Sequence, residues 1–206
     1  MKNKILSKIR GDVKKQYPNY SEDKVDEIMY GVEGIYILIT KTIIILTISI
    51  IFGIFKELLL LLLMFNLIRM VAFGMHASNS GICLVLSSII FLASAYLCKT
   101  VSIPNTLLYI LYLIVLLIMV LYAPADTVKR PLIKKKKRNI YKILSLSITI
   151  IFFITSMVIK NNLIINSMIF GLLIECLLIL PITYKIFKLP YRNYLNYGLN
   201  TWVLSV

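Results

Sequence analysis

Chemically versatile side chains are scarce in this 206-residue chain, which contains one histidine and three cysteines. Structural zinc sites normally use four closely spaced cysteine, histidine or carboxylate ligands, so no metal centre is expected. The cysteines, Cys83, Cys98 and Cys176, also lack the spacing of a disulfide framework. The scarcity leaves His76 and Cys83, seven residues apart, as the candidates for covalent chemistry.

Polar linkers and internal repeats are also lacking, and the chain is 59% hydrophobic with a mean hydropathy of +0.87. Most of its apolar runs approach the about 20 residues that a helix needs to cross a bilayer. The six runs are, in residue numbers, 35–55, 58–75, 82–98, 104–122, 140–159 and 163–182. Because no glycine-rich or serine-rich linker separates them, we predict an all-α integral membrane protein with six transmembrane helices (35–182) and a single domain (1–206).

Acidic residues are few as well, 9 against 23 Lys and Arg, for a net charge of +14. If six crossings alternate from an inner amino terminus, the outer turns hold only Lys56, Lys99 and Lys160. Because positive charge in short loops fixes orientation, both termini are expected in the cytoplasm. Nucleic acid is disfavoured as a partner, since the basic loop is tethered to lipid and lacks interleaved aromatic residues.

The segment 1–34 is predicted to lie at the inner membrane surface as two amphipathic helices. Its acidic residues interrupt the pattern of a signal peptide. Pro18 separates the two helices and Ser21 can cap the second. Anchoring to lipid and reception of a substrate helix remain alternative roles. The tail 183–206 is basic and aromatic, which is typical of an interfacial segment.

A basic cytoplasmic loop (123–139) follows the fourth run. One interpretation is a positive-inside signal that also contacts anionic membrane lipid. The other is an electrostatic receiver for an acidic peptide. The candidate substrate-binding residues of this loop are Asp126, Lys129, Arg130, Lys134, Lys135, Lys136, Lys137 and Arg138.

A thiol and an imidazole are the smallest set that performs nucleophilic acyl transfer. In one continuous helix His76 and Cys83 would stand about 10.5 Å apart along the axis, whereas proton transfer needs about 3 Å. The chain must therefore break, and Asn79-Ser80-Gly81 offers suitable residues. Cys83 would then begin the next helix, whose dipole favours thiolate. Alternatively Cys83 is a small packing residue, His76 is interfacial and Arg69 snorkels.

Two motifs carry a resemblance, RMVAFGMHASNSGIC at residues 69–83 and YAPADTVKRPL at residues 122–132. With the size and the number of runs, they closely resemble the AgrB (accessory gene regulator B) family. The resemblance implies a six-helix membrane peptidase of Gram-positive quorum sensing, with Cys83 as nucleophile, His76 as base, and Arg69 and Gly74 as supporting residues. It also implies a homodimer without a cofactor.

The implied substrate is an AgrD-like propeptide, whose charged C-terminal tail is removed through an acyl thioester before an internal cysteine or serine closes a thiolactone or lactone. Arg69, the Cys83 N–H and the Asn79 amide are alternative oxyanion donors, and Ser80 is a further supporting residue. Asp126 and Glu175 are each candidates to orient His76. The rival hypothesis is a non-enzymatic transporter or exporter of a peptide signal.

Overall fold

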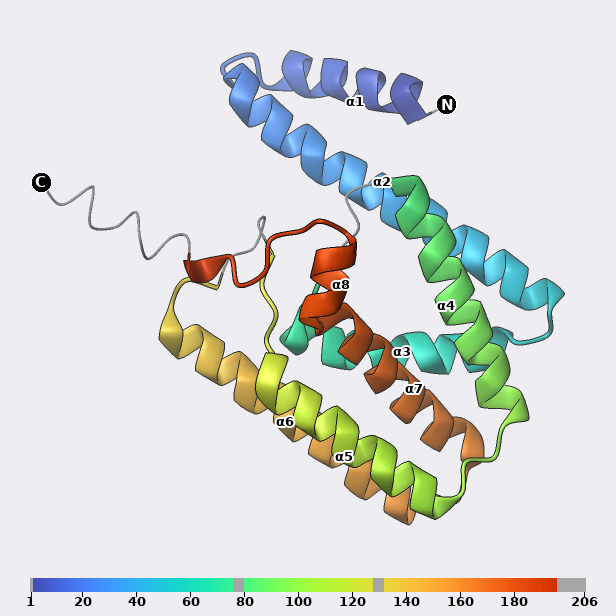
Figure 1. Cartoon of the computed structure of the whole chain (residues 1–206). Helices are drawn as coiled ribbons and strands as arrows, with labels where there is room; N and C mark the ends of the chain where they lie inside the picture. The colour runs from blue at the N-terminus through green and yellow to red at the C-terminus, as the bar shows by residue number, and fades with distance from the viewer. Residues whose placement is uncertain (1, 76–79, 128–131, 196–206) are drawn as a thin grey trace, which may run out of the picture. The chain divides into compact units, whose positions relative to one another are not determined.

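The computed structural model describes residues 2–75, 80–127 and 132–195, and Figure 1 shows their path. Within these ranges there is no β-strand and only isolated bridge residues, such as Phe73 paired with Ala125, so the predicted all-α class is confirmed. The helices are α1 (Lys2–Gln16), α2 (Glu22–Ile51), α3 (Phe55–Ala72), α4 (Ser80–Thr100), α5 (Asn105–Tyr122), α6 (Lys135–Val158), α7 (Asn162–Ile179) and α8 (Pro181–Ile186).

The chain divides into two compact units, residues 1–48 and 49–206. In the first unit α1 ends before Pro18, and the backbone N–H of Lys24 donates to Ser21 Oγ over 3.3 Å. Ser21 therefore caps α2, as the sequence predicts. The second interfacial helix and the first apolar run form one continuous helix, because no proline interrupts the helical spacing between them.

The second unit is organised around α7, which packs against α3, α4, α5, α6 and α8. A helix that touches neighbours on every side must be apolar all round. Accordingly Ile169, Leu172 and Ile179 are fully buried. Helices α5 and α6 pack side by side along one flank of this unit (Figure 1).

In the part of the chain that the structure describes, four helices, α2, α5, α6 and α7, are long and apolar enough to cross a membrane. In α3 the apolar stretch is bounded by Lys56 and Glu57 at one end and by Arg69 at the other, and in α4 the described side chains from Leu84 to Thr100 form an apolar helix. These helices fit a multi-pass membrane protein. Crossings by α3 and α4, which would make six, remain a prediction.

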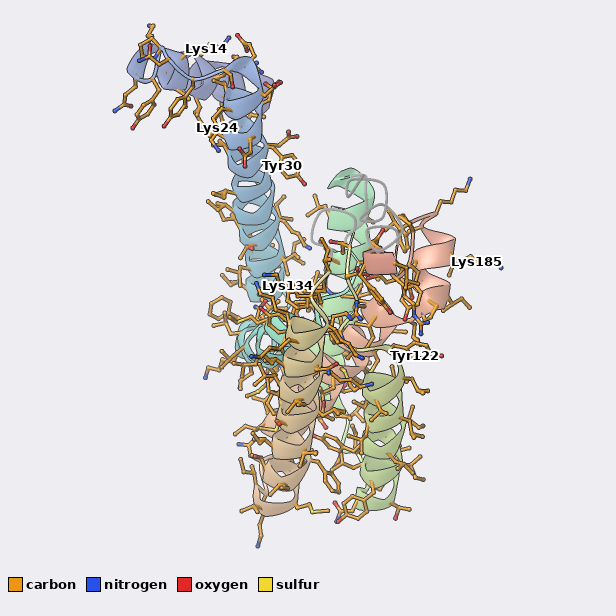
Figure 2. The ribbon with its side chains drawn as sticks, turned by 90° about the vertical axis from the view of Figure 1, so that its left-hand side faces the viewer. Lys14, Lys24, Tyr30, Tyr122, Lys134 and Lys185 are labelled. Atoms are coloured by element: carbon orange, nitrogen blue, oxygen red, sulfur yellow. The ribbon has the colours of Figure 1, made fainter. Side chains whose placement is uncertain are left out.

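The helices of the second unit alternate in direction, so that their ends gather at two opposite ends of the bundle. Tyr122, Lys134 and Lys185 lie at one of these, which we call the basic end (Figure 2). At the other end Lys99 Nζ donates to the Gly53 carbonyl over 2.8 Å. Lys56 and Lys160 also lie there, at the start of α3 and the end of α6. The three lysines that the sequence assigned to outer turns therefore share one end.

Candidate functional site

Arg69, in the last turn of α3, organises the backbone that follows this helix. Its guanidinium donates to the carbonyls of Phe73, of Gly74 (3.0 Å) and of Met75 (2.8 Å). The same group lies 3.4 Å from the carboxylate of Glu175, which is fully buried in α7. A buried ion pair contributes little net stability, but removal of one partner is strongly destabilising. The pair therefore fixes the segment Phe73–Met75 against α7.

Gly74 has the backbone conformation that this arrangement requires. Its φ is +109°, a region that residues with a side chain rarely adopt. A Cβ at this position would clash with Arg69 Nη1 and would stand 3.0 Å from the Leu178 carbonyl oxygen. The glycine thus permits the close approach of the guanidinium to the backbone.

The same segment is bound on two further sides. The Gly74 N–H donates to the Ala125 carbonyl and the Ala125 N–H donates to the Ala72 carbonyl, each over 2.9 Å. The Met75 N–H donates to the Leu178 carbonyl over 3.1 Å. We call this arrangement of Arg69, the segment 73–75, Ala125 and the end of α7 the clasp. It joins the two sequence motifs at the basic end.

Asp126 extends the clasp to the carboxy-terminal segment. Its side chain is 3% exposed, and its two oxygens accept the backbone N–H groups of Asn193 (3.0 Å) and Tyr194 (2.7 Å). The Tyr184 hydroxyl donates to the Asp126 carbonyl over 3.0 Å. Burial raises the pKa of the Tyr184 phenol, which keeps this donor protonated.

The two candidate catalytic residues flank the break between α3 and α4. His76 and Asn79 lie outside the described residues, and so do the side chains of Ser80 and Cys83. The backbone places Cys83 as the fourth residue of α4, close to the predicted helix start. His76 directly follows Met75, which the clasp holds by both its N–H and its carbonyl.

Comparisons with known proteins place the chain in a family. The family model described as accessory gene regulator B matches residues 3–179. The chain belongs to the AgrB family. It is 35% identical to a putative AgrB-like protein of Clostridium acetobutylicum, over 81% of this chain and 80% of that protein. It is 36% identical to the accessory gene regulator protein B of Staphylococcus epidermidis, over 76% and 79%. No solved structure matches the chain.

Among the other predicted site residues, the lysines that the structure describes lie at the basic end. Lys134 precedes α6, and Lys135, Lys136 and Lys137 occupy its first turn with exposed side chains. Cations at this end of a helix oppose its dipole, so helix stability does not explain them. Lys129 and Arg130 lie outside the described residues.

Sequence reasoning did not find the AgrB tail segment as part of the clasp. Arg138 stacks on the Tyr194 ring at 3.8 Å and donates to the Leu132 carbonyl over 3.4 Å. Asn193, 3% exposed, donates its amide to the Pro190 carbonyl. No periodic or spacing signal in the sequence links these residues to Asp126, since the contacts depend on the folded tail.

Proposed function

We propose that this AgrB family member is a membrane-embedded cysteine endopeptidase that removes the C-terminal tail of an AgrD-like propeptide and cyclises the remainder. The clasp is the observation that carries the proposal. It fixes the backbone up to Met75 at the basic end, and the single histidine is the next residue in the sequence. Cys83 lies at the start of α4 at the same end.

In the proposed reaction His76 accepts the thiol proton of Cys83, and the sulfur attacks the carbonyl carbon before the tail. The C–N bond breaks, and the departing amine takes the proton from the imidazole. The resulting thioester is attacked by an internal thiol or hydroxyl of the propeptide, which passes its proton to His76. Cys83 leaves as thiolate and the ring closes as a thiolactone or lactone.

Arg69 fits a positioning role better than direct contact with the reacting carbonyl. Its donors face the carbonyls of residues 73–75 and the carboxylate of Glu175. The Cys83 N–H and the Asn79 amide therefore remain the favoured candidates for the oxyanion donor.

The membrane interface suits this chemistry. Exchange of one thioester for another changes the free energy little, so exclusion of water from the intermediate decides the product. A substrate thiol held beside the thioester also gains from effective concentration. Exposed Lys135, Lys136 and Lys137 offer positive charge to an acidic tail, and a homodimer is part of the proposal.

The test uses Cys83→Ala in membranes that contain a tagged propeptide, with Cys98→Ala as the matched control. Both cysteines lie on α4, and Cys98 is buried near its other end, about 22 Å away along the axis. Loss of the nucleophile should reduce cleavage at least about 1,000-fold, while the control cleaves normally. Intact cleavage by Cys83→Ala would refute the enzyme and favour an exporter.

A further inference from the structure

A polar pocket of about 230 Å³ lies at the basic end, between the end of α5, the start of α6 and the carboxy-terminal segment. Three cationic residues, Arg138, Lys142 and Arg192, line it together with three tyrosines. Arg138 is oriented by Tyr194, and the Arg192 guanidinium carbon lies 5.5 Å from the Tyr191 ring centre. The pocket thus presents several positive charges on side chains that the fold orients.

Few negative charges compensate these cations. Among the described residues that line the pocket, Asp126 is the only acidic one, and both of its oxygens already accept backbone N–H groups. Among the described residues no ion pair joins Arg138, Lys142 or Arg192 to a carboxylate. The pocket therefore suits an anionic ligand of the size of a phosphate or carboxylate group.

A second, apolar cavity of about 300 Å³ lies farther along the same pair of helices. Its lining comes from the middle of α5 and the middle of α6, and includes Leu113, Leu116, Ile150 and Phe153. Leu113 is 59% exposed and Ile150 is 46% exposed. The cavity is therefore a groove that opens on the outer surface of the two helices.

The spacing of the two features matches the depth of a lipid leaflet. At 1.5 Å per residue, Leu116 lies about 9 Å from Tyr122 along α5, and Ile150 lies about 12 Å from Lys142 along α6. One leaflet has a hydrocarbon depth of about 15 Å, half of the bilayer core. A molecule with an anionic head in the pocket could thus extend a chain into the groove.

We propose that this α5–α6 flank binds one anionic phospholipid, with its phosphate among Arg138, Lys142 and Arg192 and an acyl chain in the apolar groove. The groove favours a lipid over an acidic peptide, because a peptide tail rich in carboxylates would gain nothing from it. Basic pockets between membrane helices bind anionic headgroups in this way. The inference does not depend on the proposed peptidase activity.

The test measures lipid adducts on the full chain in detergent by native mass spectrometry, with dioleoylphosphatidylglycerol and dioleoylphosphatidylcholine as probes. The wild-type chain should retain the anionic lipid at least about tenfold more tightly. The double variant Lys142→Gln/Arg192→Gln should lose this preference. Its control, Lys135→Gln/Lys136→Gln, removes the same charge from exposed positions outside the pocket and should keep it.

A groove variant, Leu113→Trp, should weaken binding of the anionic lipid while helix content by circular dichroism stays unchanged. Equal retention of the two lipids by the wild-type chain overturns the proposal without need of any variant. An equal loss in the control variant also overturns it, since binding would then follow net charge. If a hexaglutamate peptide displaces the lipid and Leu113→Trp has no effect, the pocket belongs to an acidic peptide instead.

Discussion

At the scale of single residues, Gly74 is a position of the clasp where an added side chain would be strained. Its φ of +109° and the clash of an added Cβ with Arg69 Nη1 combine two separate penalties. The backbone conformation alone costs about 1–3 kcal/mol for a residue with a side chain. Gly74→Ala should therefore shift the clasp, and a displacement of about 1 Å can lower processing about 100-fold. Cleavage of a tagged propeptide in membranes measures this.

Gly31→Ala is the matched control for that experiment. An added Cβ at Gly31 meets nothing within 4 Å, and the helical position gains from the better propensity of alanine. Its processing should equal that of the wild-type chain. If Gly74→Ala also processes normally, the clasp does not position the catalytic residues.

Glu175 tests the same clasp from the opposite side. Glu175→Gln keeps the shape of the side chain but leaves the Arg69 guanidinium without its buried counter-charge. Such a loss typically costs about 3–5 kcal/mol. Thermal unfolding in detergent should show this loss of stability as a lower Tm. The control Glu57→Gln, at the partly exposed start of α3, should change the Tm little. Equal Tm values for Glu175→Gln and the wild-type chain would show that the pair is dispensable.

At the scale of elements, the six apolar runs predicted the order and number of the long helices, because each of α2 to α7 overlaps one run, although most helix ends differ from the run ends by a few residues. The length of an apolar run can be read from neighbouring residues in the sequence, without knowledge of the folded chain. The clasp could not be predicted in the same way. Its contacts join Ala125, Leu178 and Asn193 to residues far away in the chain, and only the packing of α7 brings these segments together. Gly74 was predicted only by resemblance to the family motif. The structure explains why a glycine is needed there: its φ is positive, and the Arg69 guanidinium leaves no room for a Cβ.

Asn166 connects two elements at the end opposite the clasp. Its amide, 1% exposed in α7, donates to the carbonyls of Cys98 (3.2 Å) and Val101 (2.7 Å), where α4 ends. The last carbonyls of a helix have no partner within it. Asn166→Ala should therefore destabilise the fold by about 1–3 kcal/mol. The exposed Asn162→Ala, which loses a bond of 3.3 Å to Ser102, should cost less than about 0.5 kcal/mol.

Unfolding midpoints in detergent compare the two variants. A similar shift for both would mean that the buried amide does not hold the end of α4.

At the scale of the whole molecule, the charge of the second unit is divided between its two ends. Lys56, Lys99 and Lys160 are the basic residues of the end opposite the clasp. The basic end carries the basic residues at the start of α6, in α8 and in the segment that follows α8. Because short loops rich in Lys and Arg stay in the cytoplasm, the clasp and the lipid pocket are expected to face the cell interior.

Cysteine labelling in intact cells tests that orientation. Lys160→Cys should react with a membrane-impermeant maleimide added outside, whereas Lys135→Cys should react only after the cells are permeabilised. Both cysteines are introduced into a Cys83→Ala chain, whose two remaining thiols, Cys98 and Cys176, are each 2% exposed and give a low background. Both introduced positions are exposed: Lys135 is the first residue of α6 and Lys160 follows its end, and the 24 residues of this helix span about 36 Å. This length exceeds the thickness of the hydrocarbon core, about 30 Å. Labelling at the two ends of one helix therefore tests both faces of the membrane. Labelling of Lys135→Cys in intact cells would place the clasp outside and reverse the assigned orientation.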